Sequence, residues 1–220
     1  MGELAPSIIA ADFGRLAEEL GRVEPFSKRW HVDIMDGHYV PNLTIGPMIV
    51  SAIAAVSGLP QDVHLMITNP DATWQWYADA GASRIAFHPE ASADAVRLLR
   101  TIRERGLGAG LAVNPDVEAD DVKGYLDEVD HLVVMSVNPG FSGQSFIRGA
   151  LPKLERLREW VDATSPGVQL VIDGGVNLDT APECVAAGAD VLVSASAIFG
   201  AADPADVARR LRELAEAGTR

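Results

Sequence analysis

Short apolar runs alternate with longer amphipathic segments along the chain, and this pattern occurs eight times. Brief apolar runs bounded by turn residues are typical of buried strands, whereas apolar positions that recur about every three or four residues are typical of helices. The expected strands cover Pro6–Ala10, Arg29–Met35, Asp62–Ile67, Arg84–His88, Gly108–Val113, His131–Val137, Gln169–Asp173 and Val191–Ser194. The expected helices cover Phe13–Val23, Pro47–Ser57, Asp71–Ala80, Ala91–Arg105, Val117–Leu126, Ala150–Ala163, Leu178–Ala187 and Pro204–Ala217.

This alternation fits either an eight-stranded parallel barrel or an open, doubly wound sheet. The barrel is favoured by the count of eight, by the lack of a G-x-G-x-x-G pattern after the first strand, and by polar residues at the carboxyl ends of several strands. No Pro/Ser-rich linker or low-complexity tract interrupts the chain. We therefore expect an α/β protein with one domain, a TIM (β/α)8 barrel over residues 1–220.

Charge and hydropathy argue against some classes of binding partner. The formal net charge is -13 and the basic residues are scattered, which argues against binding to nucleic acid or to an anionic membrane. The start MGELAPS has no apolar signal core, and no apolar run reaches the roughly 20 residues of a membrane span. The single cysteine, Cys184, lies in an apolar helical segment and is expected to be a buried thiol. These features suit a cytoplasmic protein.

The segment His31–Asn42, read HVDIMDGHYVPN, contains the strongest signal of a site. Side chains on a strand alternate between two faces, so Trp30, Val32 and Ile34 form an apolar face. The opposite face carries an imidazole, a carboxylate and a thioether just before Asp36 and Gly37 end the strand with turn chemistry. A purely structural strand has little reason to place His and Asp there.

Polar residues on other expected strands extend this signal. In a barrel the carboxyl ends of all strands meet at one rim, which would bring together Ser7, His31, Asp33, His64 and Asp173, with Met35, Met66 and Met135 on matching positions. Two His and two Asp suit one divalent ion of the Zn, Fe, Mn or Co kind.

Taken singly, each of these residues has a structural explanation. A lone strand histidine is usually satisfied in the core, an Asp before Gly usually forms a turn, and alternate methionines usually fill gaps in the core. The coincidence of all four ligand-type residues at expected strand ends favours a shared site.

Glycine-rich loops follow the last three expected strands. They are Asn138–Gln144, Asp173–Gly175 and the pair Ala195–Ser196, which opens a short apolar segment. Late loops of a barrel, with the N-terminus of a small extra helix, commonly bind a phosphate group through backbone N–H groups. Neutral amides would let so acidic a protein bind a phosphate, although glycines in any one loop can serve only as turns.

A cation flanked by two carboxylates beside a phosphate site indicates a reaction class. A phosphorylated ketose could bind the ion through its carbonyl and hydroxyl oxygens, which acidifies the C–H bond between them. Asp33 and Asp173, from the second and seventh expected strands, would lie on opposite faces of the resulting enediolate. One would remove a proton and the other would return one, which inverts the carbon. The methionines would help to exclude water.

Seven distinctive segments are spread over nearly the whole chain: PSIIAADF, HVDIMDGHYVPNLTIGP, DVHLMI, FHPEA, VVMSVNPGFSGQSF, DGGV and AGADVLVSASAIFG. With these segments the chain closely resembles the ribulose-phosphate 3-epimerase family. This resemblance implies a TIM barrel and a homo-oligomer, either a dimer or a hexamer. It also implies conversion of D-ribulose 5-phosphate to D-xylulose 5-phosphate in the pentose phosphate pathway, by two-base proton transfer through a 2,3-enediolate.

The resemblance also implies roles for individual residues. The metal ligands would be His31, Asp33, His64 and Asp173, with Asp33 and Asp173 as the acid/base pair. The expected substrate-binding residues are Ser7, Met35, His64, Met66, Met135, Gly140, Phe141, Ser142, Gly143, Gly174, Gly175, Ala195 and Ser196. His38 and His88 match family positions but are not expected to be ligands. Ser142 and Ala195 stand where the family usually has glycine.

Three alternatives remain open. An almost identical site could epimerise a related ketose phosphate, such as allulose 6-phosphate. A decarboxylase on a similar phosphate-binding barrel would carry an Asp-x-Lys-x-x-Asp pattern, whereas the third expected strand here reads Asp62-Val63-His64 without a lysine. A non-catalytic phosphate-binding barrel would be favoured by loss of a ligand, and none of the four is lost.

Overall fold

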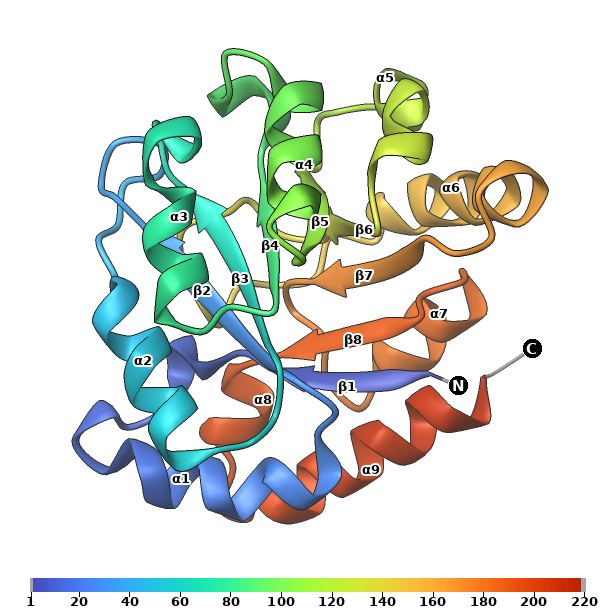
Figure 1. Cartoon of the computed structure of the whole chain (residues 1–220). Helices are drawn as coiled ribbons and strands as arrows, with labels where there is room; N and C mark the ends of the chain where they lie inside the picture. Colours follow the sequence, from blue (N-terminus) through green and yellow to red (C-terminus); the bar gives the residue numbers. More distant parts are fainter. Residues whose placement is uncertain (1, 219–220) are drawn as a thin grey trace.

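The computed structural model describes residues 2–218, in which eight parallel strands alternate with helices and form a TIM barrel (Figure 1). The strands are β1 (Glu3–Pro6), β2 (Trp30–Met35), β3 (Gln61–Met66), β4 (Arg84–Phe87), β5 (Gly108–Val113), β6 (His131–Met135), β7 (Gln169–Asp173) and β8 (Val191–Ser194). They are hydrogen-bonded in the order β1-β8-β7-β6-β5-β4-β3-β2. A parallel bridge between Ser7 and His31 links the two ends of the sheet. The expected single-domain barrel is confirmed, while residues 1, 219 and 220 of its expected range lie outside the described part.

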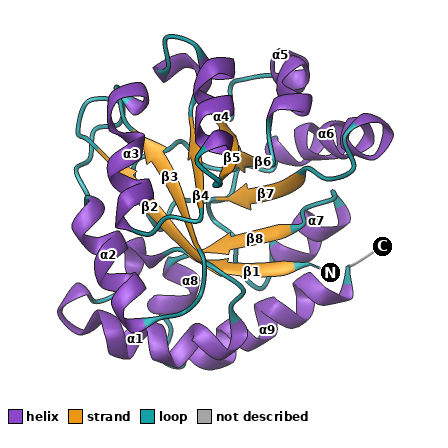
Figure 2. Cartoon of the chain, in the orientation of Figure 1, coloured by secondary structure: helices purple, strands orange, loops and turns teal. Residues whose placement is uncertain are grey.

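Helices surround the strands (Figure 2). The α-helices are α1 (Leu16–Val23), α2 (Pro47–Val56), α3 (Pro70–Ala80), α4 (Ala95–Glu104), α5 (Ala119–Val122), α6 (Ala150–Thr164), α7 (Ala181–Ala186), α8 (Ser196–Phe199) and α9 (Pro204–Ala217). The 3-10 helices are η1 (Ile8–Ala10), η2 (Phe13–Arg15), η3 (Glu24–Phe26), η4 (Pro89–Ala91) and η5 (Lys123–Glu128). Within residues 2–218, no helix combines the length and apolar character needed to cross a membrane.

The strands are buried on both faces, as parallel strands between a barrel interior and a helical layer must be. Trp30, Val32 and Ile34 of β2 point outward into the core shared with the helices. Small apolar residues from several strands, including Ala5 and Ala86, fill the interior. The barrel is therefore packed rather than hollow, and polar side chains that point inward are exceptions that need an explanation.

The first expected strand, Pro6–Ala10, is wrong. The strand ends at Pro6, and Ile8–Ala10 form the 3-10 helix η1. The reason is local, because the Ser7 hydroxyl accepts a hydrogen bond from the backbone N–H of Ile9 and thereby turns the chain. The strand instead uses Glu3–Pro6, which pair in register with β8.

Four expected helices begin later or are tighter than the pattern predicts. The expected helix Phe13–Val23 begins as the 3-10 helix η2, and α1 begins at Leu16. Asp94 caps α4 by accepting from the Arg97 N–H, so that helix begins at Ala95 rather than at Ala91. The Asn177 side chain accepts from Asp179 and Thr180 and holds a turn, so α7 begins at Ala181 rather than at Leu178. The expected helix Val117–Leu126 has only one α-helical turn before it tightens into η5.

Candidate metal centre and active site

The four expected ligands come from three strands and point into the barrel. His31 and Asp33 lie on β2, His64 lies on β3, and Asp173 is the last residue of β7. The β2–β3 register places Asp33 directly opposite His64. The expectation that all four lie at strand ends is correct only for Asp173, because Asp33 and His64 stand two residues before the ends of β2 and β3 and His31 is the second residue of β2. They still meet, because strands in a barrel are tilted and staggered, so that different positions along neighbouring strands share one level.

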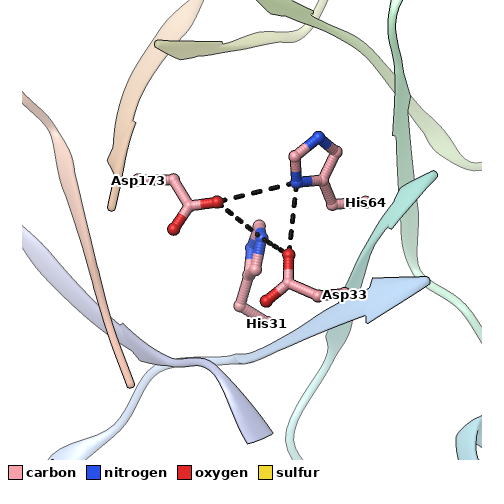
Figure 3. Close-up of side chains that lie close together, drawn as sticks. All are labelled: His31, Asp33, His64 and Asp173. Carbon is pink, nitrogen blue, oxygen red and sulfur yellow. Dashed lines mark ion pairs between the residues drawn. The ribbon is translucent and has the colours of Figure 1, made fainter. Parts of the chain in front are cut away.

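The four side chains converge on one point, as Figure 3 shows. One ligand atom from each residue lies within 4.8 Å of all the others. His31 Nε2 lies 3.3 Å from Asp33 Oδ1 and 3.5 Å from Asp173 Oδ2. His64 Nδ1 lies 3.3 Å and 3.6 Å from the same two oxygens. All four residues are buried.

This donor set fits a divalent cation. Within residues 2–218, His31 Nε2, His64 Nδ1 and Asp33 Oδ1 are buried and have no hydrogen-bond partner. A buried polar atom without a partner costs about 1–3 kcal/mol, so three such atoms facing one point indicate that a common ligand satisfies them. Two imidazole nitrogens and two carboxylate oxygens form a mixed set that suits first-row divalent metals. The cluster can therefore hold one divalent metal ion.

The charges of the site are coupled. Burial by itself lowers the pKa of His31 and of His64, but Asp33 and Asp173 outweigh it, and the pKa of each imidazole is raised above the ordinary 6.5. Burial works against ionisation of Asp33, yet His31 and His64 lower its pKa. The pKa of Asp173 is also lowered by the two imidazoles, although burial and the charge of Asp33 oppose this. The carboxylates therefore attract positive charge to the point between them.

Besides His31 and His64, the Asp33 carboxylate has a third partner in Ser7. Its hydroxyl donates to Asp33 Oδ2, the oxygen that does not face the imidazoles. The backbone N–H of Ser7 donates to the Ser194 carbonyl at 2.9 Å, which fixes the start of η1 beside β8. Thr44 donates to the backbone carbonyl of Asp33 at 2.9 Å. The orientation of the Asp33 carboxylate is thus set by its neighbours.

The turn after β2 is held by a carboxylate that does not face the cluster. Asp36 accepts four hydrogen bonds of 2.8 Å, from the N–H groups of His38, Tyr39 and Thr68 and from the Thr68 hydroxyl. Burial opposes its ionisation, but the four hydrogen bonds together outweigh it and lower the pKa of Asp36 to about 2. The conspicuous Asp36 therefore orders the loop, while Asn42 at the end of the motif donates to the Gly140 carbonyl at 2.6 Å.

A cavity of about 420 Å³ opens above the cluster. Its lining includes all the expected substrate-binding residues except His64, namely Ser7, Met35, Met66, Met135, Gly140, Phe141, Ser142, Gly143, Gly174, Gly175, Ala195 and Ser196. Asp33 and Asp173 also line it. His64 is fully buried, so it faces the cluster rather than the cavity. The loops after β6, β7 and β8 thus meet over the two carboxylates.

Sequence reasoning missed several residues of this cavity. Gln144, Phe146 and Asn177 lie in the same loops as the expected glycines, and Ile9 and Val137 flank expected residues. Their positions next to the glycine motifs were the available signal. It also missed that His88, which directly follows β4, contacts His64. Among the lining residues that the structure describes, none carries a positive charge.

The chain is similar to known proteins over nearly its whole length. A family model described as "Ribulose-phosphate 3 epimerase family" matches residues 3–199. A curated relative from Mycobacterium tuberculosis named "Ribulose-phosphate 3-epimerase" is 46% identical over 217 residues, which cover 98% of this chain and 94% of that protein. A protein of the same name from Bacillus subtilis is 43% identical over 205 residues, which cover 92% and 94%.

Solved structures share the barrel at much lower identity. A 3-hexulose-6-phosphate synthase aligns with a TM-score of 0.72 and 20% identity, covering 96% of this chain and 99% of that chain. A 3-keto-L-gulonate-6-phosphate decarboxylase from Vibrio cholerae aligns with a TM-score of 0.74 and 13% identity, covering 100% and 99%. These two show the fold alone, whereas the family model and the relatives above 40% identity cover nearly the whole chain. The chain therefore belongs to the ribulose-phosphate 3-epimerase family of enzymes.

Proposed function

We propose that this enzyme inverts C3 of D-ribulose 5-phosphate to give D-xylulose 5-phosphate, by proton transfer between two aspartates through a 2,3-enediolate. The observation that supports this most directly is the pair Asp33 and Asp173. The two carboxylates come from β2 and β7, are both buried, and face each other within the four-residue cluster (Figure 3). Such a pair can reach a substrate carbon from two sides, which inversion requires.

Asp33 and Asp173 exchange roles with the direction of the reaction. The ionised carboxylate of one takes the proton from C3, and the electron pair of that C–H bond forms the enediolate. The other carboxyl enters the step protonated and delivers its proton to the opposite face of C3. The first residue ends protonated and the second ionised, so atoms and charge balance, and the reverse reaction begins from that state.

His31, His64, Asp33 and Asp173 would hold one divalent ion, of the Zn, Fe, Mn or Co kind. When bound, this ion supplies positive charge that stabilises anionic oxygen beside the two carboxylates. The imidazoles contribute neutral nitrogen donors and the aspartates contribute negative charge, which together suit a divalent cation. The Ser7 hydroxyl keeps one oxygen of Asp33 engaged and fixes the orientation of the other.

The loops after β6, β7 and β8 are proposed to bind the phosphate. Gly143, Gly174 and Gly175 have positive φ angles of 79°, 114° and 66°, which lets consecutive N–H groups point in directions that other residues rarely allow. Backbone amides attract an anion without a cationic side chain, which agrees with a lining that has no positively charged residue among those described. Met35, Met66 and Met135 contribute apolar surface to the lining of the same cavity.

The test is a coupled assay of D-ribulose 5-phosphate conversion by the purified protein, repeated after chelation and after adding back each of the four metals. We expect turnover that chelation abolishes and that at least one metal restores. The reaction in D₂O should place deuterium at C3 of the product, because two different groups remove and return the proton. Turnover that chelation leaves unchanged, or product without solvent deuterium, would contradict the proposal.

The same assay with D-allulose 6-phosphate addresses the alternative substrate. Ser142 and Ala195 both line the cavity, so they are placed to affect the choice of sugar phosphate. We expect a larger kcat/KM for the pentose phosphate, and a larger value for the hexose phosphate would reassign the substrate while keeping the chemistry.

A further inference from the structure

His64 uses its two ring nitrogens for different contacts. Nδ1 faces the Asp33 and Asp173 carboxylates at 3.3 Å and 3.6 Å. Nε2 lies 3.0 Å from Nε2 of His88, a residue that the proposed reaction does not use. Both rings are fully buried, at 0% exposed surface, so water does not compete for this contact. Which ring nitrogen of His64 carries a hydrogen therefore depends on His88.

The strand pattern explains why His88 lies there. Ala86 of β4 points into the barrel and stands opposite His64 in the β3–β4 register. His88 follows two residues later and points to the same side, because side chains alternate along an extended chain. Ala86 is small, which leaves room for the His88 ring to reach back toward His64. The rings are 5.1 Å apart between centroids and tilted by 31°.

The contact between the two Nε2 atoms restricts which ring nitrogens of His64 and His88 can carry a hydrogen. One Nε2 must donate and the other must accept, because a hydrogen bond needs a single hydrogen between them. For a neutral His64 to offer the Nδ1 lone pair to a cation, its hydrogen must be on Nε2. His88 Nε2 is then the acceptor, and the hydrogen of a neutral His88 is on Nδ1. The opposite arrangement would place a hydrogen on His64 Nδ1 and block that donor.

The surroundings of His88 favour the first arrangement. Glu90 Oε1 lies 3.8 Å from His88 Nδ1, longer than a hydrogen bond but close enough for its charge to favour an N–H group there. That oxygen is held in place because it accepts from the Tyr39 hydroxyl at 2.7 Å and from Asn114 Nδ2 at 2.8 Å. Tyr39 also packs on the His88 ring, with 4.8 Å between centroids.

We propose that His88 is a positioning residue for the metal centre: it accepts the Nε2–H of His64, under the influence of Glu90, and so keeps His64 Nδ1 available to the cation. This inference rests on the metal centre of the proposed function and extends it to loops after β2, β4 and β5, which supply Tyr39, Glu90 and Asn114. Partners of this kind, one step removed from the ligands, orient the ring and strengthen metal binding.

The test measures the affinity of the purified protein for Zn²⁺ alone, by competition with a chromophoric chelator. His88→Phe keeps a ring but removes the acceptor, His88→Gln supplies a carbonyl oxygen, and Glu90→Gln removes only the charge. We expect His88→Phe to weaken binding about 10- to 100-fold, His88→Gln to bind at least about threefold more tightly than His88→Phe, and Glu90→Gln to lose about threefold. Glu128→Gln is the matched control, because Glu128 pairs with Arg100 near the start of β6, and its affinity should be unchanged.

A second measurement does not depend on whether a variant folds. Long-range proton–nitrogen NMR spectra of the Zn²⁺-loaded wild-type protein report which ring nitrogens carry hydrogen. We expect hydrogen on Nε2 of His64 and on Nδ1 of His88. Hydrogen on His64 Nδ1, a folded His88→Phe variant with wild-type affinity, or equal affinities of His88→Phe and His88→Gln would overturn the inference. If the wild-type protein itself bound no Zn²⁺ and no other divalent metal, the proposed metal centre would fail first.

Discussion

Asp173 shows at the scale of one residue why the cluster is interpreted as functional. It is the last residue of β7 and only 9% of its surface is exposed, so its charge is removed from most of the solvent. Burying a carboxylate is unfavourable unless partners compensate, and here the partners are His31 and His64 at 3.5 Å and 3.6 Å. Apolar residues would stabilise this position with less electrostatic cost. Selection for a cation site and for acid/base chemistry explains the arrangement better.

We predict that Asp173→Asn abolishes turnover and leaves the fold intact. An amide neither takes nor gives the C3 proton, so kcat should fall by about 100- to 10,000-fold. The backbone contacts of residue 173 do not involve its carboxylate, since its carbonyl accepts from the Ser136 N–H at 2.8 Å and from the Ser136 hydroxyl at 3.0 Å. Steady-state kinetics checks the loss of turnover, and the circular dichroism spectrum checks that the fold is intact.

Asp179→Asn is the matched control, because Asp179 is an exposed acid in the loop that follows Asp173. It should keep wild-type turnover. A folded Asp173→Asn variant that lost less than about tenfold in kcat would rule out Asp173 as an acid/base group.

The raised pKa values of His31 and His64 predict that metal binding releases protons. Asp33 and Asp173 hold these imidazoles protonated to a higher pH than usual, and only the neutral imidazole can bind a metal. Affinity should therefore fall as the pH decreases, and binding near neutral pH should displace protons into the buffer. Titration calorimetry in two buffers of different ionisation enthalpy measures the number of protons released per metal ion bound. Zero released protons together with an affinity independent of pH would show that both imidazoles are already neutral.

At the scale of one element, the loop between β7 and α7 packs its backbone directly against the loop after β6. Gly175 has φ of 66°, and a Cβ there would lie 2.8 Å from the backbone N and Cα of Phe146 in the loop after β6. The Ser136 hydroxyl donates to the Gly174 carbonyl at 2.6 Å and holds the same loop from β6. Two glycine-rich loops are thus in close backbone contact, and the absence of a side chain permits it.

We predict that Gly175→Ala raises KM more than it lowers kcat. The added methyl group must push the two loops apart, which should displace the amides proposed to bind phosphate, far from the reacting carbon. Loss of one hydrogen bond to a charged group corresponds to about 1.5 kcal/mol, or about a tenfold increase in KM. Gly167→Ala is the control, because no atom lies within 4 Å of its added Cβ. An unchanged KM in a folded Gly175→Ala variant would remove this loop from the phosphate site.

Elements with clear apolar runs could be predicted from the sequence. The bounds of β5, β7 and β8 agree with expectation because each run is buried on both faces and ends at a turn or polar residue. Pro6–Ala10 could not be predicted, since one side-chain hydrogen bond from Ile9 to Ser7 outweighs the strand pattern. Local hydrogen bonds of this kind have no periodicity in the sequence.

The candidate site was predictable in its residue types but not in its geometry. Alternation along β2 identifies His31 and Asp33 as inward residues, and the same rule applies to His88 after β4. It does not give the stagger between strands, which decides that His88 reaches His64 and that His31 joins from the second position of its strand. The homo-oligomer implied by the family resemblance stays a prediction.

At the scale of the whole molecule, charged groups close the end of the barrel where the strands begin. Arg29, just before β2, donates to Glu3 of β1 at 2.9 Å and to Asp62 of β3 at 3.3 Å. Arg84 of β4 also approaches Asp62, at 3.7 Å, and donates to Gln169 of β7 at 2.6 Å. The Arg29–Glu3 pair crosses the seam between β1 and β2, where Ser7 and His31 form an isolated bridge. Arg29 thus connects the first three strands.

We predict that Arg29→Met lowers the free energy of unfolding by about 3 kcal/mol, because it leaves the Asp62 carboxylate buried with only the more distant Arg84. The side chains of Arg29 and Asp62 are 12% and 6% exposed, so solvent cannot replace the lost partner. Arg105→Met is the matched control: its pair with Asp79 has side chains 60% and 62% exposed, and its loss should cost less than about 1 kcal/mol. Urea denaturation of the wild type and the two variants measures their free energies of unfolding. Equal losses in the two variants would show that burial of the Arg29 ion pairs adds nothing to stability. Turnover by folded Arg29→Met should match the wild type, since Arg29 contacts none of the four ligands.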